Sequence, residues 1–427
     1  MSFSVLPLHV FLVNRLTELN YQQPTPIQLQ AIPVILSGKD VMAGAQTGTG
    51  KTAAFALPIL HKLLCNYDDL KAKKQHGCDI TPTDYIRPIS ALVLVPTREL
   101  AQQVHHSIEQ YAKGCDINSV MVYGGVSVQA QVNKLALGTD ILVATPGRLL
   151  DLLRQRALSL SQLEYLVFDE ADRMLDMGFK DEIVDVLKRV PKTRQTLLFS
   201  ATLDDRIFSF SKRLLQSPQV IEVAKRNTTA ASIVERVYNV DIERKCALIC
   251  HLINCENWQQ TLIFSRTKQG ADALVKQMQR AGVPAESFHS DLSQATREQV
   301  LAQFKAGEVK ALVATDVAAR GLDINELNYV VNIELPFQVE DYVHRIGRTG
   351  RAGKQGQAIT LLSIDDEPLL TKLEAFLDRR LPQQWLPGFE PDLMKVAPKT
   401  RKTTKGAIKQ QARKKALGQS NSRGRKG

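Results

Sequence analysis

The sequence predicts an α/β protein made of two parallel-sheet units in series, followed by a basic C-terminal segment. Three observations indicate this fold class. Short apolar runs alternate with longer helical stretches, the alternation starts again halfway along the chain, and apolar residues become scarce after about residue 395. Such alternation predicts parallel sheets with helices on both faces. A length of 427 residues is enough for two domains that each bury a core.

Six predicted strands form the first unit, and each is a run of four or five mostly apolar residues. They begin at Val41, Ala91, Val120, Asp140, Tyr165 and Thr196. Four further runs define the second unit, and they begin at Thr261, Ala311, Tyr329 and Ala358. Before the first strand, residues 1–16 are interpreted as an amphipathic helix. A secretion signal is disfavoured because the segment has no basic start and no small-residue cleavage site.

Domain boundaries follow from local composition. Residues 1–223 are predicted to form the first domain and residues 233–391 the second, with a polar linker at 224–232 that has no apolar periodicity. Residues 66–88 mix charge, Gly and Pro just before a strand, which predicts a surface loop insertion. Residues 392–427 are rich in Lys, Arg, Gly, Ser, Thr and Gln and cannot bury a core, which predicts a disordered tail.

The positive charge of the chain is concentrated in this tail. The sequence has 55 Lys and Arg against 44 Asp and Glu, a formal net charge of +11. Residues 392–427 hold 12 basic residues and one acidic residue, which is also +11, so residues 1–391 hold 43 of each sign. The segment therefore suits a non-specific tether for a nucleic-acid backbone, with solubility as the alternative role.

Cysteine use and hydropathy exclude several classes of protein. The six cysteines form no CxxC pair and no zinc-finger spacing, which favours a reducing, cytoplasmic location. Cys246, Cys250 and His251 lie in an apolar helical stretch, so core packing is a better interpretation than metal binding. No apolar run approaches the roughly 18 residues that span a bilayer, so we expect no membrane association.

A phosphate-binding loop is predicted at residues 45–52, which read AQTGTGKT between a strand and a helix. Glycines there allow successive backbone N–H groups to point at phosphates, Lys51 can reach the β and γ oxygens, and Thr52 can hold a magnesium ion. The alternative is a glycine-rich turn. The residues expected to contact the nucleotide are Gln46, Thr47, Gly48, Thr49, Gly50, Lys51 and Thr52.

An acidic cluster follows the strand that begins at Tyr165. Asp169 and Glu170 lie at the C-terminal end of that strand, where α/β sheets place their chemistry. Asp169 can hold Mg²⁺ while Glu170 polarises the attacking water. The alternative is an acidic helix start that is favoured by the helix dipole.

Positive charge for the transition state is expected from the second unit. Residues 344–351 read HRIGRTGR and supply Arg345, Arg348 and Arg351. An arginine finger contributes on the order of a thousand-fold or more in rate. Because these residues and the phosphate loop belong to different units, the complete site can form only when the units close on each other.

Together with PTRELA, TPGR and SAT, these motifs resemble the DEAD-box RNA helicases over roughly residues 3–391. The resemblance implies two RecA-like domains and implies ATP and Mg²⁺ as cofactors. It also implies that Phe3, Tyr21 and Gln28 bind the adenine side of ATP, as in the family's Q motif. Asn20 stands where the family usually has Gly. Asp323 is expected at the ATP ribose.

The same resemblance assigns the remaining residues. Arg348 and Arg351 become the arginine fingers, and His344 helps to order the attacking water. Ser200 and Thr202, from the SAT motif, couple hydrolysis to RNA remodelling. The residues implied to contact the RNA backbone are Thr97, Arg98, Gly125, Thr145 and Arg148 in the first unit and Arg266, Thr267 and Thr315 in the second.

The expected function is therefore ATP-dependent remodelling of single-stranded RNA and short duplexes without sequence preference, because hydroxyls, amides and guanidinium groups suit backbone contacts. Two alternatives remain at this point: an ATP-gated RNA clamp with negligible turnover, and a DNA-translocating helicase. The segment LPGFEPD at residues 386–392 resembles the bacterial RhlE-like group. A monomer is expected, and ribosome assembly or RNA decay proteins are the partners that the family suggests.

Overall fold

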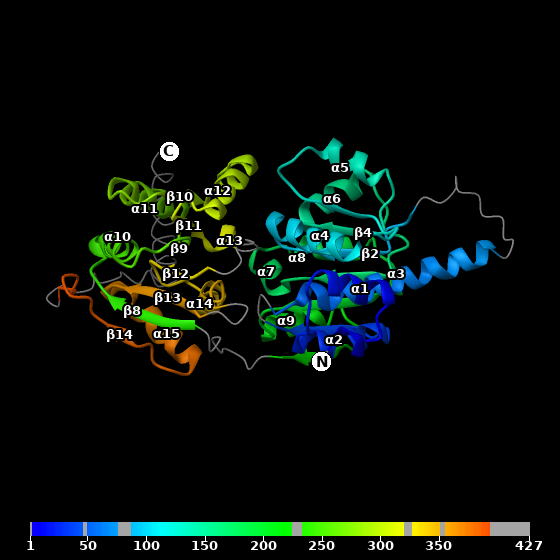
Figure 1. Cartoon of the computed structure of the whole chain (residues 1–427), viewed down its shortest axis with the longest axis horizontal. Helices are drawn as coiled ribbons and strands as arrows, with labels where there is room; N and C mark the ends of the chain where they lie inside the picture. Colours follow the sequence, from blue (N-terminus) through cyan, green and yellow to red (C-terminus); the bar gives the residue numbers. More distant parts are fainter. Residues whose placement is uncertain are drawn as a thin grey trace, which may run out of the picture.

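The computed structural model describes residues 2–45, 49–75, 87–223, 233–319, 327–350 and 355–392. Within these ranges the chain forms two seven-stranded parallel sheets, each covered by helices on both faces (Figure 1). This arrangement confirms the predicted α/β fold class. The predicted linker at 224–232 and the tail beyond Asp392 lie outside the described residues, so the proposed domain boundaries and the predicted disorder of the tail stay predictions.

The first sheet has the strand order β3-β4-β2-β5-β6-β1-β7. Its strands are β1 (Val41–Gly44), β2 (Ala91–Leu94), β3 (Ser119–Val122), β4 (Ile141–Ala144), β5 (Tyr165–Phe168), β6 (Gln195–Ser200) and β7 (Gln219–Glu222). Its helices are α1 (Val10–Glu18), α2 (Pro26–Leu36), α3 (Lys51–Gln75), α4 (Arg98–Ala112), α5 (Val128–Leu135), α6 (Pro146–Arg154), α7 (Ala171–Asp176), α8 (Lys180–Leu187) and α9 (Asp205–Ser211).

Alternate residues of the first sheet face two separate cores. Side chains of α1 to α4 pack on one face, and side chains of α5 to α9 pack on the other. The N-terminal helix predicted over residues 1–16 is helical only in its second part: α1 begins at Val10, after a short 3₁₀ turn at Phe3–Val5, and it packs into the first of these cores.

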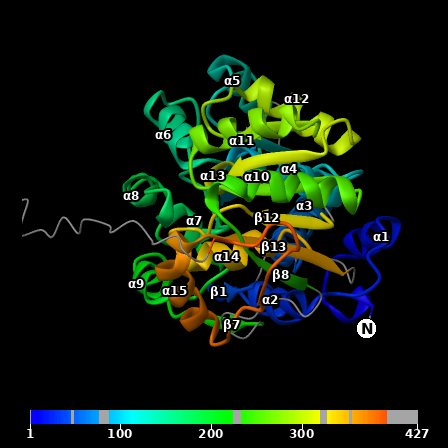
Figure 2. The ribbon, with the colours of Figure 1, turned by 90° about the vertical axis from the view of Figure 1, so that its left-hand side faces the viewer.

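The second sheet has the order β10-β11-β9-β12-β13-β8-β14. Its strands are β8 (Ile233–Asn239), β9 (Thr261–Ser265), β10 (Ala285–Phe288), β11 (Ala311–Thr315), β12 (Tyr329–Asn332), β13 (Gly356–Leu362) and β14 (Gln383–Gln384). Its helices are α10 (Lys245–Cys255), α11 (Lys268–Arg280), α12 (Gln294–Ala306), α13 (Asp316–Ala319), α14 (Val339–Ile346) and α15 (Glu367–Leu377). Helices α10 and α11 cover one face, and α12 to α15 cover the other (Figure 2).

The two sheets have the same topology. Counted from the start of each domain, both strand orders are third, fourth, second, fifth, sixth, first, seventh. The helix after the first strand begins at Lys51 in one domain and at Lys245 in the other. Lys245 is buried, and its Nζ donates to Asp366 Oδ2 at 2.9 Å and to the Ile333 carbonyl at 3.0 Å.

One predicted loop was wrong in its first half. Residues 66–75, which we expected to begin a surface loop, continue helix α3 to Gln75. The segment contains no Gly or Pro before Gly77, and Leu, Lys, Ala and Gln all favour helix, so nothing in the backbone ends the helix earlier. Residues 76–86 of the same prediction lie outside the described residues. No helix within the described ranges is long and apolar enough to cross a membrane.

Candidate nucleotide and RNA site

The candidate site lies at the C-terminal ends of three neighbouring strands of the first sheet. Strands β5, β6 and β1 are adjacent. They are followed by Asp169 and Glu170, by Ala201 and Thr202, and by the phosphate-loop segment that ends at Lys51. Because parallel strands share one carboxyl edge, residues separated by more than a hundred positions in sequence meet there.

Asp169 and Glu170 are both buried, at 2% and 3% exposure. Glu170 caps helix α7 with a left-handed backbone, φ 55° and ψ 51°, which is uncommon for a residue other than Gly. Burial raises the pKa of Asp169 to about 6, although Lys51 opposes the rise. Burial acts on Glu170 in the same direction, but Arg173, Lys51 and Arg348 outweigh it and lower the pKa of that carboxyl below its ordinary value. The acidic helix start expected as an alternative would be solvated, and this one is not.

Several buried polar atoms of the site have no hydrogen-bond partner among the described residues. They are Lys51 Nζ, Asp169 Oδ1, Glu170 Oε2 and Ser200 Oγ. Buried groups of this kind are costly unless a ligand or water satisfies them. The described residues contain no cluster of three His, Cys, Asp or Glu side chains that would hold a metal alone. The donor set therefore fits a nucleotide phosphate with Mg²⁺, an ion that proteins bind through one or two carboxylates together with phosphates and water.

Asp172 connects three parts of the site, although the sequence assigned it no role. Its Oδ2 accepts from the backbone N–H groups of Ala201 and Thr202, each at 3.2 Å, and from Thr202 Oγ1 at 3.3 Å. His344 of the second domain approaches the same oxygen with its Nε2 at 3.9 Å. Burial opposes the charge of Asp172, but His344 and Arg173 outweigh it and lower its pKa. Asp172 thus links Thr202 of the first domain to His344 of the second.

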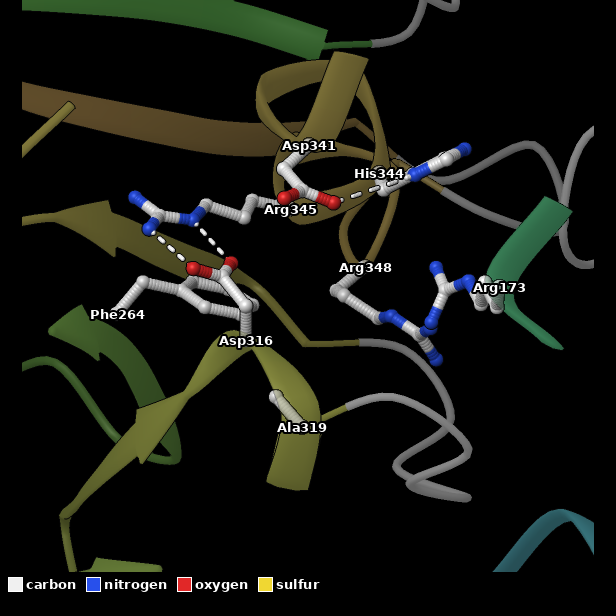
Figure 3. Close-up of a pocket in the computed structure, with 8 residues that line it drawn as sticks. All are labelled: Arg173, Phe264, Asp316, Ala319, Asp341, His344, Arg345 and Arg348. Carbon is white, nitrogen blue, oxygen red and sulfur yellow. Dashed lines mark hydrogen bonds and ion pairs between the residues drawn. The ribbon is translucent and has the colours of Figure 1, made fainter. Parts of the chain in front are cut away.

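Helix α14 brings the arginine motif of the second domain to this position (Figure 3). Arg348 is buried and acts electrostatically on Glu170. Arg345, which the sequence grouped with the possible fingers, is instead committed within its own domain. It binds Asp316 through Nε and Nη2 at 2.6 and 2.7 Å, and its Nη1 donates to Asn332 Oδ1 and the Glu334 carbonyl.

The predicted adenine-side residues lie on the N-terminal segment and α2. Phe3 is buried with its ring edge against Tyr21, which makes a similar contact with Tyr111. Gln28 Oε1 accepts from Thr25 N at 2.9 Å and forms a capping box, while its Nε2 donates to the Gly50 carbonyl at 3.1 Å. Asn20 has φ 60°, a conformation that Asn tolerates better than most residues, which explains how it replaces Gly.

The predicted RNA residues of the first domain are linked by contacts around the β3–α5 loop. Thr97 caps helix α4 by accepting from Leu100 N at 3.2 Å. Gly125 has φ +88°, and a Cβ there would lie 2.1 Å from Arg98 Nη1. Arg148 donates to Gln131 Oε1 at 2.9 Å and to the Val126 carbonyl at 3.1 Å, so its guanidinium holds this loop. Thr145 begins helix α6 without a side-chain capping bond.

In the second domain, the equivalent residues follow β9 and β11. Thr267 caps helix α11, as Thr97 caps α4. Arg266 is engaged internally, with Nη2 on Asp366 Oδ1 at 2.7 Å and Nε on the Leu335 carbonyl at 2.5 Å. Thr315 is buried at the end of β11.

Helices α4 and α12 join the domains at a second contact that the sequence did not reveal. Arg297 Nη2 lies 2.8 Å from Glu99 Oε1, with both side chains buried. Arg98 Nη1 donates to Gln294 Oε1 at 3.3 Å, and Gln102 Nε2 donates to Glu298 Oε1 at 3.3 Å. Both domains therefore contact each other around the acidic cluster and again beside the predicted RNA residues.

The structure brings together Lys51, Asp169, Glu170, Thr202, His344 and Arg348. Thr49, Gly50 and Thr52 lie at or next to the start of α3, in the same strand-to-helix connection. Five predicted site residues lie outside the described residues: Gln46, Thr47 and Gly48 of the phosphate loop, Asp323 and Arg351.

Two RecA-like domains, with Lys51 and the acidic cluster in one and Arg348 from the other, fit a two-domain nucleotide-dependent enzyme. Family models agree. The DEAD/DEAH box helicase model matches residues 25–209, and the helicase conserved C-terminal domain model matches residues 244–353. The chain belongs to the DEAD-box helicase family.

Relatives and solved structures support the same family. The ATP-dependent RNA helicase CshA of Listeria monocytogenes is 41% identical over 379 residues, covering 89% of this chain and 69% of that protein. The RNA helicase CrhR of Synechocystis is 39% identical over 370 residues, covering 86% and 70%. The structure of S. cerevisiae Dbp5 bound to RNA and ADP BeF3 is 28% identical with a TM-score of 0.76, covering 91% of this chain and 95% of that chain.

Proposed function

We propose that the chain is an RNA-stimulated ATPase that separates short RNA duplexes or remodels RNA–protein complexes. ATP and RNA bind together between the two domains, without preference for sequence. The observation that carries this proposal is the meeting of Lys51, Asp169 and Glu170 of the first domain with His344 and Arg348 of the second. ATP drives the cycle only through its different affinity for the open and closed arrangements.

Each residue near the phosphates has a separate proposed role. Lys51 and the phosphate-loop backbone bind the β and γ phosphates, and Arg348 together with Arg351 neutralises charge in the transition state. Glu170 orients the attacking water, and His344 helps to order it. Bound Mg²⁺ would neutralise the phosphate oxygens, held by Thr52 and Asp169. The unsatisfied Lys51 Nζ and Asp169 Oδ1 support this assignment.

We propose that the N-terminal segment and α2 recognise the adenine base and that the second domain recognises the ribose. Gln28 reads adenine, with Phe3 and Tyr21 at the same side and Asp323 at the ribose. The contact from Gln28 to Gly50 supports a link between base and phosphate recognition, because one side chain restrains the last residue before Lys51.

RNA is proposed to lie along Thr97, Arg98, Gly125, Thr145 and Arg148 of the first domain and Arg266, Thr267 and Thr315 of the second. Contacts with phosphate and sugar would position the strand without reading bases. Because Arg148 and Arg266 already hold internal partners, we propose that they shape the loops that bind RNA. Ser200 and Thr202 couple this surface to the nucleotide through Asp172.

Finer assignments rest on sequence alone. We propose the RhlE-like group from residues 386–392, a monomeric state, a cytoplasmic location, and a role beside ribosome-assembly or RNA-decay proteins. Crosslinking the protein to RNA in cells and sequencing the bound RNA would test the substrate.

Glu170→Gln tests the proposed reaction. If Glu170 orients water, the variant should lose RNA-stimulated ATP hydrolysis by about a hundredfold or more while retaining ATP and RNA affinity, because the amide cannot accept the proton. Glu164→Gln, at the exposed opposite end of β5, is the matched control and should hydrolyse normally.

The same assay separates the alternatives. Steady-state turnover by the natural chain argues against a passive RNA clamp, and stimulation by RNA but not DNA argues against a DNA translocase. Near-normal hydrolysis by Glu170→Gln would remove Glu170 from the mechanism.

A further inference from the structure

Arg173 is a charged side chain buried near the site, at 1% exposure, and no role follows for it from the motifs. It lies on α7, three residues after Glu170, and its Nε is 3.3 Å from Glu170 Oε2 as an ion pair. Its Nε and Nη1 have no hydrogen-bond partner among the described residues. A buried guanidinium is costly unless it is paired, and among the described residues Arg173 forms its ion pair with Glu170.

Arg345 shows what a structural arginine looks like in the same molecule. It is equally buried, and its Nε, Nη1 and Nη2 are all committed to Asp316, Asn332 and Glu334. A guanidinium has five N–H donors in a fixed fork, and Arg345 makes four hydrogen bonds with them. Arg173 does not, and its contact with a neighbouring ionised group is with Glu170.

The surroundings of Arg173 are unusual because a second arginine faces it. Arg173 of the first domain and Arg348 of the second line one cavity together with His344, and their guanidinium groups point toward each other (Figure 3). Like charges at close range repel unless an anion lies beside them. Both arginines act on Glu170, whose pKa they help to lower against the effect of burial.

The Glu170 carboxylate also needs a contact that fixes its orientation. It occupies the N-cap of α7 with a left-handed backbone and makes no side-chain capping bond, so the helix does not fix its carboxylate. A glutamate side chain has several rotatable bonds, and catalysis requires its oxygens to be held within a fraction of an ångström. Arg173 lies in the same domain and can hold the carboxylate before the domains close.

We propose that Arg173 is a positioning residue for hydrolysis: it holds the Glu170 carboxylate in its working orientation, so that the carboxylate is ready when Arg348 arrives from the second domain. The inference rests on the proposed role of Glu170. Arg173 itself contacts neither nucleotide nor water in this scheme.

The test uses the full chain with saturating RNA and three variants. Arg173→Met keeps most of the volume without charge or donors, and should lower kcat for ATP about tenfold to a hundredfold with KM changed less than about twofold. Arg173→Lys keeps the charge without the fork and should recover part of kcat. Arg206→Gln is the control. Arg206 pairs with Asp176, which lies on α7 as Arg173 does, but the Arg206 side chain is 57% exposed, so this variant should keep normal kcat and KM. Thermal unfolding and ATP-analogue binding verify that each variant is folded.

A second comparison decides whether Arg173 acts through Glu170. In single-turnover hydrolysis, adding Arg173→Met to Glu170→Gln should cause no further loss, because the group being positioned is already gone. The inference would be overturned if the rate loss of the double variant equalled the product of the two single losses. It would also be overturned if Arg173→Met raised KM and left kcat normal. If Arg173→Met hydrolyses ATP normally and Glu170→Gln does not, only the role of Arg173 is overturned. If Glu170→Gln also hydrolyses ATP normally, the proposed reaction is overturned as well.

Discussion

Asp169 combines complete burial with an acceptor oxygen that has no hydrogen bond among the described residues. The sequence indicated its place at the end of a strand and its chemistry as a carboxylate. Its depth and its neighbours, Lys51 and Glu170, could not be predicted, because they depend on how β1 and β5 lie in the sheet.

A pH dependence of magnesium binding follows. Burial raises the pKa of Asp169 to about 6, so the carboxylate is lost as pH falls through that value. Since Mg²⁺ competes with the proton, the apparent Mg²⁺ dissociation constant for ATP-analogue binding should rise about tenfold per pH unit below pH 6 and stay level above about pH 7. Magnesium titrations across this range measure it. Asp169→Asn should remove the dependence, and an unchanged requirement at about pH 5 would contradict the assignment.

Gln28 has two structural bonds as well as its proposed contact with adenine. Gln28→Ala removes the capping box and the bond to Gly50, so it should lower stability by about 1 kcal/mol and weaken ATP more than GTP. Gln28→Glu keeps the acceptor for Thr25 N but sets a buried carboxylate oxygen against the Gly50 carbonyl, so it should also lose stability and lose the preference for ATP. Thermal melts and nucleotide competition measure the two effects. Equal loss for both nucleotides would make Gln28 purely structural.

At the scale of elements, the central strands were predictable and several others were not. Strands such as β2 and β11 are buried on both faces and read as continuous apolar runs. Strands β7, β8, β10 and β14 were not predicted from the sequence. Strands β7 and β10 pair on one side only, and β8 carries the sequence IVERVYN, in which polar residues interrupt the apolar pattern. Contacts such as Glu99–Arg297 were also missed, because they join residues that sequence spacing does not relate.

Helices α4 and α12 provide a test of closure. The Glu99–Arg297 ion pair crosses the domain boundary at 2.8 Å with both side chains buried. Replacing either residue, as in Glu99→Gln or Arg297→Met, leaves the other charge unpaired in the closed arrangement and should weaken RNA binding with an ATP analogue by about 2 kcal/mol or more. The double variant should lose less than the sum of the two. Additive losses in this cycle would mean that the pair does not form on closure.

For the whole molecule, the sequence predicted two α/β domains and a composite site because the motifs occur in both halves. It could not predict which surfaces meet, since domain contacts depend on packing between residues far apart in the chain. The C-terminal segment illustrates this. Leu386 and Phe389 pack against the core between the second sheet and helices α10 and α11, and Arg244 lies over the Phe389 ring at 5.2 Å, so the folded body extends almost to the start of the basic tail.

Truncation after Pro391 should therefore leave the body intact and remove the whole formal net charge of +11. RNA binding at low salt should weaken, and four lost phosphate contacts would reduce the slope of log affinity against log salt by about 3 units. The maximal ATPase rate at saturating RNA should survive, because every proposed hydrolytic residue lies before residue 392. Affinity measured across a salt series tests the tether, and an unchanged slope would dismiss it.

Lys245 and Asp366 also bear on the stoichiometry of the enzyme. In two sheets of identical order, the lysine that begins the helix after the first strand has no hydrogen-bond partner among the described residues of one domain, and in the other domain it is paired with Asp366. The second domain thus carries an internal counter-ion at the position where Lys51 of the first domain is proposed to bind phosphate. One chain should consequently bind a single nucleotide. In this proposal the first domain binds the nucleotide phosphates, and the second domain closes on them.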